Sequence, residues 1–201
     1  MKATICIILF AIPVLLSGQD NASMSYQEGL ESCKRIVEEN RKSSPNKHAM
    51  TGPECLNGAR VPEFSARTMD GKEISPAYFK GKITILNLWL ISCAPCLAEI
   101  PGLNNVIETY GHEKLNYLAI SLDDEKDIRD FLVKNPWGFS QIPSGMDLAI
   151  DIFNARWGFP TTFVFNEDAV IIAAFSGGKV DEQAVQEIED KLSGIISAEL
   201  K

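Results

Sequence analysis

The stretch from Leu88 to Pro101 reads LWLISCAPCLAEIP and contains two cysteines, Cys93 and Cys96, separated by two residues. A CxxC pair can be a redox-active disulfide, part of a metal site or a structural disulfide. The preceding run, Ile83 to Leu90, is almost entirely apolar, which predicts a central strand covered on both faces. A helix is expected from about Ala94. The pair should therefore lie where a buried strand ends and a helix begins.

This position favours redox chemistry. Unpaired N–H groups and the helix dipole stabilise a thiolate at a helix N-terminus. We expect Cys93 to lie there, partly exposed, and Cys96 to lie one turn inward and more buried. This asymmetry suits a thiol that attacks and a second thiol that resolves. A zinc site would need further ligands, and neither His48 nor His112 has a ligand-like spacing with a cysteine. Leu97 follows the pair, so the haem signature CxxCH is absent. No metal or other cofactor is predicted.

The N-terminus resembles a targeting signal. Lys2 precedes an apolar run from Ala3 to Leu16, which is shorter than the roughly 20 residues that span a bilayer. Ser17 and Gly18 supply small residues near a cleavage point. We expect residues 1–18 to be a cleaved signal peptide and the protein to be exported to the periplasm; a retained anchor is the alternative.

Composition predicts a globular protein that does not bind nucleic acid. The 201 residues are 45% hydrophobic and 23% charged, with a formal net charge of −8. Nucleic-acid binding requires a concentrated basic surface, which this charge argues against.

The remaining chain divides into an N-terminal helical segment, residues 19–57, and one α/β domain, residues 58–201. Strands alternate with helices and end in a hairpin and a final helix, a pattern typical of layered α/β folds. The expected elements are a helix within Tyr26–Asn40, a hairpin turning at Asp70-Gly71, helices Lys126–Lys134 and Asp147–Ala155, strands Leu115–Leu122, Thr161–Asn166 and Val170–Phe175, and a helix from about Asp181.

Cys33 and Cys55 are the other cysteines outside the predicted signal. Four cysteines allow three pairings, and the sequence does not choose among them. A Cys33–Cys55 bridge would pin the N-terminal helix across a polar loop and stabilise the fold by about 3 kcal/mol. Two free thiols, a second redox relay and intermolecular pairing are the alternatives.

Two segments carry a family resemblance. NLWLISCAPCLAEIP, with Asn87, Trp89 and Pro101 around the cysteines, and WGFPTTFVFNED, with Pro160, resemble the thioredoxin superfamily in its exported TlpA/ResA-like branch. The likeness runs from about Gly58 to the C-terminus. It implies a three-layer sandwich with a central mixed sheet, helices on both faces, an N-terminal β-hairpin extension and a central βα insertion.

The resemblance also implies roles for individual residues. Cys93 and Cys96 would be the redox-active disulfide, and Glu99 a buried acid that transfers protons. Phe159, Pro160 and Trp89 would form the substrate-binding surface. Spacing alone is equally compatible with a trans Pro160 that starts a strand, and with a solvated Glu99 that complements the helix dipole. The resemblance implies a cis Pro160. It also implies Trp before the first cysteine, where this chain has Ser92.

The implied function is exported thiol–disulfide exchange with protein disulfides, in the direction of reduction. A membrane thiol–disulfide transporter would supply electrons, and apocytochrome c is one candidate target. A peroxiredoxin-like thiol peroxidase is the second hypothesis, although it normally uses a cysteine outside a CxxC pair. A thioredoxin-fold binding module with an inactive pair is the third.

Overall fold

The structure, a computed structural model, describes residues 23–43 and 51–201. The predicted signal peptide, residues 1–18, lies outside the described residues, and the boundary at residue 58 stays a prediction. In the part that the structure describes, no helix is long and apolar enough to cross a membrane. The α-helices are α1 Tyr26–Ser43, α2 Ala94–Tyr110, α3 Glu125–Lys134 and α4 Gln183–Glu199, and the short helical turns are η1 Pro53–Leu56, η2 Pro76–Phe79 and η3 Leu148–Ile152.

A five-stranded mixed sheet forms the centre of the fold, in the order β5-β4-β3-β6-β7. Its strands are β3 Ile83–Trp89, β4 Leu115–Ser121, β5 Ser140–Ile142, β6 Thr161–Phe165 and β7 Ile171–Ser176. Strand β3 pairs in parallel with β4 and antiparallel with β6. Every residue of β3 is buried, as the apolar run predicts. The end of β3 is therefore held from both sides at the point where the CxxC loop begins.

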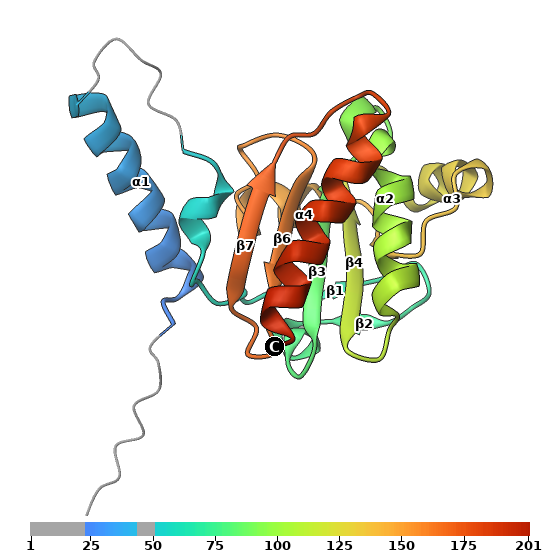
Figure 1. The fold of residues 1–201 in the computed structure, drawn as a ribbon, viewed down its shortest axis with the longest axis horizontal. Coiled ribbons are helices and arrows are strands. Elements are labelled where there is room, and N and C mark those ends of the chain that lie inside the picture. The colour runs from blue at the N-terminus through green and yellow to red at the C-terminus, as the bar shows by residue number, and fades with distance from the viewer. Residues whose placement is uncertain (1–22, 44–50) are drawn as a thin grey trace, which may run out of the picture.

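Helices α2 and α4 pack together over one face of the sheet (Figure 1). Gly102 permits their close approach, because a Cβ there would lie 2.4 Å from the Val185 carbonyl oxygen. The apolar cluster beneath them includes Trp89 and Ile100, and α3 adds Ile128 to it. Thus the helix that begins at the cysteines is fixed by both the sheet and α4.

The opposite face of the sheet is covered by η1, η2, η3 and part of α1. Tyr26 of α1 donates a hydrogen bond to the Phe153 carbonyl oxygen at 2.7 Å, and the two rings meet edge to face. Burial raises the pKa of Tyr26 well above its ordinary value, so the phenol remains a donor. In Figure 1, α1 lies beside the sheet at the end opposite α3.

The two predicted additions to the thioredoxin-like sandwich are present. Strands β1, Ala66–Arg67, and β2, Glu73–Ile74, form the N-terminal hairpin, and Gly71 takes a φ of 85° in its turn. The central insertion is α3 followed by β5, a helix–strand order instead of the expected strand–helix order, and β5 adds an edge strand parallel to β4. The fold class predicted from the sequence is confirmed.

Two expected helices have different bounds. The stretch Asp147–Ala155 was expected to be helical; residues 147–152 are helical and end in the π-helical turn η3, whereas residues 153–155 are not. Asn154 has a φ of 50°, a left-handed conformation that cannot continue a right-handed helix. Helix α1 extends to Ser43, beyond the Asn40 expected from its apolar spacing.

Candidate active site

Cys93 and Cys96 form a disulfide with a Cα–Cα distance of 5.3 Å. Cys93 is the N-cap residue of α2 and is half-buried, whereas Cys96 in the first turn is only 3% exposed. The backbone N–H of Cys96 donates to the Cys93 sulfur at 3.2 Å. A thiolate on Cys93 would receive this hydrogen bond together with the positive end of the helix dipole, and both favour the charged form.

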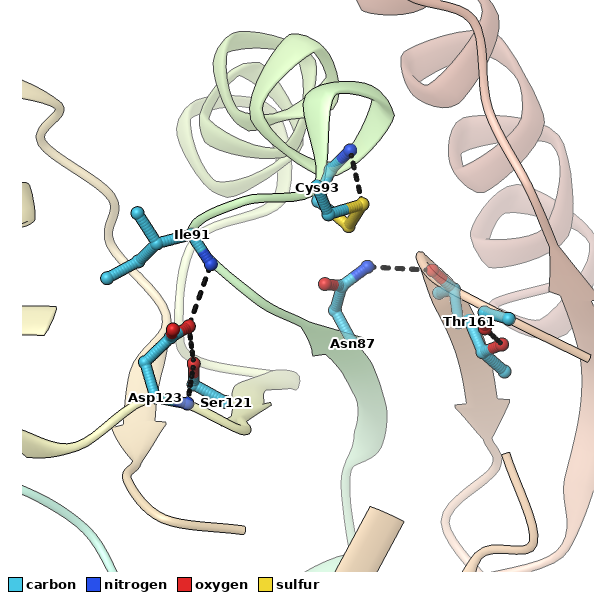
Figure 2. The surroundings of a disulfide bond; sticks show 9 residues. Asn87, Ile91, Cys93, Ser121, Asp123 and Thr161 are labelled. Atoms are coloured by element: carbon cyan, nitrogen blue, oxygen red, sulfur yellow. Dashed lines mark hydrogen bonds between the residues drawn. A yellow bond between two sulfur atoms is a disulfide. The ribbon is translucent and has the colours of Figure 1, made fainter. Parts of the chain in front are cut away.

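The segment before Cys93 is held by a carboxylate from the neighbouring strand end. The backbone N–H of Ile91 donates to Asp123 Oδ2 at 2.7 Å, and the Ser121 hydroxyl donates to the same oxygen at 2.9 Å (Figure 2). From the sequence, Asp123 and Asp124 are both candidates for the N-cap of the next helix. That cap is Asp124, whose side chain accepts from Asp127 N. The role of Asp123 depends on β4 lying beside β3, which its sequence neighbours do not reveal.

The Phe159–Pro160 peptide bond is cis. Pro160 is buried and Phe159 half-buried, immediately before β6. The first residue of β6, Thr161, pairs with Leu88, so Pro160 lies beside the end of β3. The Pro160 carbonyl oxygen accepts a hydrogen bond from Gly177 N at 2.9 Å. The topology therefore brings the proline segment, the CxxC loop and the loop after β7 to one edge of the sheet.

Glu99 lies on α2, one turn after Cys96, and is only 5% exposed. Its Oε2 atom is buried without a hydrogen-bond partner. Burial raises the pKa of this carboxyl to about 7, with Glu187 adding to the rise and Lys191 opposing it. A group with this pKa can both accept and donate a proton near neutral pH, unlike the solvated glutamate of the alternative interpretation.

Trp89 requires a correction. It was expected on the substrate-binding surface, but its side chain is 0% exposed. Its indole N–H donates to Gln141 Oε1 at 3.0 Å, and its ring packs edge to face on Trp137. Trp89 is thus a core residue beneath the site, because the inserted α3–β5 segment covers it.

Asn87 lies in β3 below the disulfide and is buried (Figure 2). Its Nδ2 donates to Thr162 Oγ1 on β6 at 2.9 Å. An amide cannot exchange a proton at this place as a carboxylate could. This leaves Glu99 as the buried acid close to the cysteines.

Ser92 is exposed and lines a cleft of about 480 Å³ beside Cys93. Ile91, Phe131 and Asp123 also line this cleft. The small side chain leaves Cys93 without the flat apolar neighbour that the resemblance implies at this position.

Cys33 and Cys55 form a second disulfide, with a Cα–Cα distance of 5.2 Å, which joins α1 to η1. Among the residues that the structure describes, no group of three or more His, Cys, Asp or Glu side chains could hold a metal ion.

Comparison with known proteins identifies the family. Residues 57–174, more than half of the chain, match the AhpC/TSA family. The chain belongs to the AhpC/TSA family. Thiol-disulfide oxidoreductase ResA of Bacillus thuringiensis subsp. konkukian is 28% identical over 142 residues, which cover 69% of this chain and 78% of that protein. Thioredoxin-like protein YneN of Bacillus subtilis is 27% identical over 136 residues, which cover 66% of this chain and 78% of that protein.

A solved structure from Chlorobium tepidum, described as a thiol:disulfide interchange protein DsbE, has the same fold. It matches with a TM-score of 0.61 at 20% identity, over 71% of this chain and 96% of that one. The predicted recognition and enzyme class are confirmed: the chain is a thiol–disulfide oxidoreductase of thioredoxin-like fold.

Proposed function

We propose that the chain reduces disulfides of exported proteins with the Cys93–Cys96 pair. The observation that supports this most is the asymmetry of the pair at the N-terminus of α2. Cys93 is accessible and caps the helix, while Cys96 is buried. A nucleophile that substrate can reach and a resolving thiol that it cannot reach are what ordered disulfide exchange requires.

In the proposed reaction, the reduced enzyme begins with a Cys93 thiolate and a Cys96 thiol. The thiolate attacks one sulfur of the substrate disulfide; a new S–S bond forms as the substrate bond breaks, and one substrate thiolate leaves. Cys96 then loses its proton and attacks the Cys93 sulfur. The mixed disulfide breaks, the second substrate thiolate leaves, and the enzyme becomes the disulfide form of Figure 2. The substrate gains two electrons.

Glu99 would accept the proton of Cys96 and later return it. Its burial and its pKa of about 7 support this role, since proton transfer is most effective when the pKa lies near the working pH. Phe159 and Pro160 would bind the substrate chain as a short added strand, with the Phe159 backbone offering the hydrogen-bonding groups.

The enzyme must be reduced again after each turnover. An exported protein works in an oxidising compartment, so a membrane thiol–disulfide transporter is the proposed electron source. Disulfide-bearing proteins, with apocytochrome c as one candidate, are the proposed substrates. The name ResA borne by a relative is consistent with this reaction class.

Replacing Cys96 by Ser tests the proposal, because the mixed disulfide on Cys93 can then no longer be resolved. We expect covalent complexes with exported proteins in the native cell, released by dithiothreitol. The matched control, Cys93→Ser, should trap none. If the Cys96→Ser protein instead consumes peroxide and traps no protein, the peroxidase hypothesis replaces this one. If reduced wild-type protein neither reduces protein disulfides nor consumes peroxide, the binding-module hypothesis replaces both.

A further inference from the structure

The loop between β7 and α4 lies against the CxxC helix. Gly177 anchors this loop through its hydrogen bond to the Pro160 carbonyl oxygen, at 2.9 Å. The next residue, Gly178, passes over α2 near Pro95 and Glu99. The loop thus connects the cis-proline segment to the helix that carries the cysteines.

A side chain at position 178 would collide with the Glu99 carboxyl. A Cβ atom there would lie 2.4 Å from Glu99 Oε1, 3.2 Å from Glu99 Cδ and 3.5 Å from Pro95 Cβ. The first distance is shorter than real Cβ contacts allow. Gly177 has a φ of 78°, which itself favours glycine, whereas Gly178 does not lie in this left-handed region. A side chain at position 178 would therefore displace the Glu99 carboxyl without straining the backbone of residue 178.

The Glu99 carboxyl beneath this loop also lies near charged side chains of α4. Its Oε2 atom has no hydrogen-bond partner. The charged groups that face Glu99 are Glu187 and Lys191 of α4. Cys93 and Cys96 lie at the N-terminus of α2, the helix that carries Glu99. Glu187 is itself paired with Lys179 of the loop, at 3.3 Å. The Gly178 backbone is thus one of the groups that limit the access of water to the carboxyl.

We propose that Gly178 is a positioning residue for disulfide exchange: the absence of a side chain lets the β7–α4 loop close over the Glu99 carboxyl and keep water from it. This inference rests on the proposed role of Glu99 in proton transfer. In Gly178→Ala, either the carboxyl moves or the loop lifts, and either change hydrates Glu99. Hydration favours the charged form of a carboxyl.

The test measures the Glu99 carboxyl directly. In protein labelled with ¹³C at glutamate carboxyls, we expect the pKa of Glu99 to fall in Gly178→Ala from about 7 toward its ordinary value of 4.5, by about one unit or more. The pH profile of Cys93 alkylation in the reduced protein should shift with it. Gly194→Ala is the matched control, because a Cβ there meets nothing within 4 Å, and it should move neither titration.

A conservative second change keeps the test decisive. Adding Glu99→Asp to Gly178→Ala shortens the acid and makes room for the new methyl group. This double variant should regain a raised carboxyl pKa, and it also serves if Gly178→Ala alone does not fold. An unchanged Glu99 titration in Gly178→Ala, or a double variant whose carboxyl titrates at the ordinary value, would overturn the inference.

Failure of the proposed function gives a different result. If Glu99→Gln leaves the Cys93 alkylation profile unchanged, Glu99 has no role in proton transfer. The carboxyl titration of Gly178→Ala would still show whether Gly178 covers it. If Glu99→Gln shifts the profile while Gly178→Ala leaves the carboxyl pKa unchanged, the positioning role alone is wrong.

Discussion

The two disulfides of this chain have nearly equal spans but different surroundings. Their Cα–Cα distances are 5.3 Å for Cys93–Cys96 and 5.2 Å for Cys33–Cys55. Cys93 caps a helix, where backbone N–H groups are free to stabilise a thiolate. Cys33 lies inside α1, is 6% exposed and packs in the apolar cluster on the opposite face of the sheet. Position on a helix and access, not the bond itself, separate an exchangeable disulfide from a structural one.

The two bonds also differ in what they connect. Cys93 and Cys96 are three residues apart in one helical turn, so their bond constrains little of the chain. Cys33 and Cys55 are 22 residues apart and join α1 to η1. Loss of the first should affect chemistry, and loss of the second should affect stability.

The largest expected effect is on turnover. Cys93→Ser should reduce insulin-disulfide reduction to the background of dithiothreitol alone, because the attacking thiolate is gone. The double variant Cys33→Ser with Cys55→Ser should keep turnover near that of the wild type. If the second variant were inactive, the proposed division between the two disulfides would be wrong.

The second prediction concerns stability. Removing the Cys33–Cys55 bridge with two serines should lower the unfolding free energy by about 3 kcal/mol, because the unfolded chain regains the entropy of a long loop. The Cys93–Cys96 bridge closes a much shorter loop, so replacing these two cysteines by serines should cost only about 2 kcal/mol. Guanidinium unfolding of the oxidised proteins measures both. An equal or reversed order would contradict the assignment.

The third prediction follows from the raised pKa of Glu99. Its carboxyl titrates at about 7 in the folded protein against 4.5 without burial, so the native state binds more protons between these pH values. Its stabilising contribution is present below pH 4.5 and is lost as the pH rises through 7. The loss is on the order of 3 kcal/mol. Glu99→Gln should remove this fall in unfolding free energy.

Denaturation of the oxidised protein at several pH values between 4.5 and 8 measures this effect. Glu108→Gln, an exposed glutamate of the same helix, is the control and should retain the wild-type pH dependence. If the unfolding free energy of Glu99→Gln fell with pH as steeply as that of the wild type, Glu99 would be solvated.

The smallest expected effect is at Asp123. Asp123→Ala leaves the Ile91 N–H and the Ser121 hydroxyl without their acceptor and should lower the unfolding free energy by about 1 kcal/mol. Asp123→Asn retains a carbonyl oxygen as acceptor, so its unfolding free energy should fall by less than that of Asp123→Ala. The change should also slow alkylation or turnover at Cys93 without affecting the Cys33–Cys55 bridge, which lies over the other face. Equal stability of the Ala and Asn variants would argue against the hydrogen bond.

Local pattern was sufficient for much of the fold. The apolar run Ile83–Leu90 predicted a strand buried on both faces, and β3 is buried throughout. Asp70-Gly71 predicted a hairpin turn, which Gly71 forms with a positive φ. The pattern overextended the helix expected at Asp147–Ala155, which ends after Ile152 because the left-handed Asn154 cannot continue it.

In the active site, too, some features follow from local sequence and others depend on tertiary packing. The helix N-terminus behind Cys93 follows from a strand and a helix that adjoin in the sequence. The burial of Trp89 does not, because the covering residues Trp137 and Phe131 come from the insertion. The contact of Asp123 with Ile91 depends on the register of β4 against β3.

The sequence by itself determined that an accessible and a buried cysteine share the first turn of a helix, because strand and helix periodicity are local properties of the chain. It left the pairing of Cys33 with Cys55 and the environment of Glu99 open. The tertiary structure decided both. The first depends on α1 meeting η1 across a loop, and the second on a glycine from a distant strand end lying over the carboxyl. Such contacts arise only when remote segments pack together, and packing sets the dielectric environment and the pKa of a buried acid.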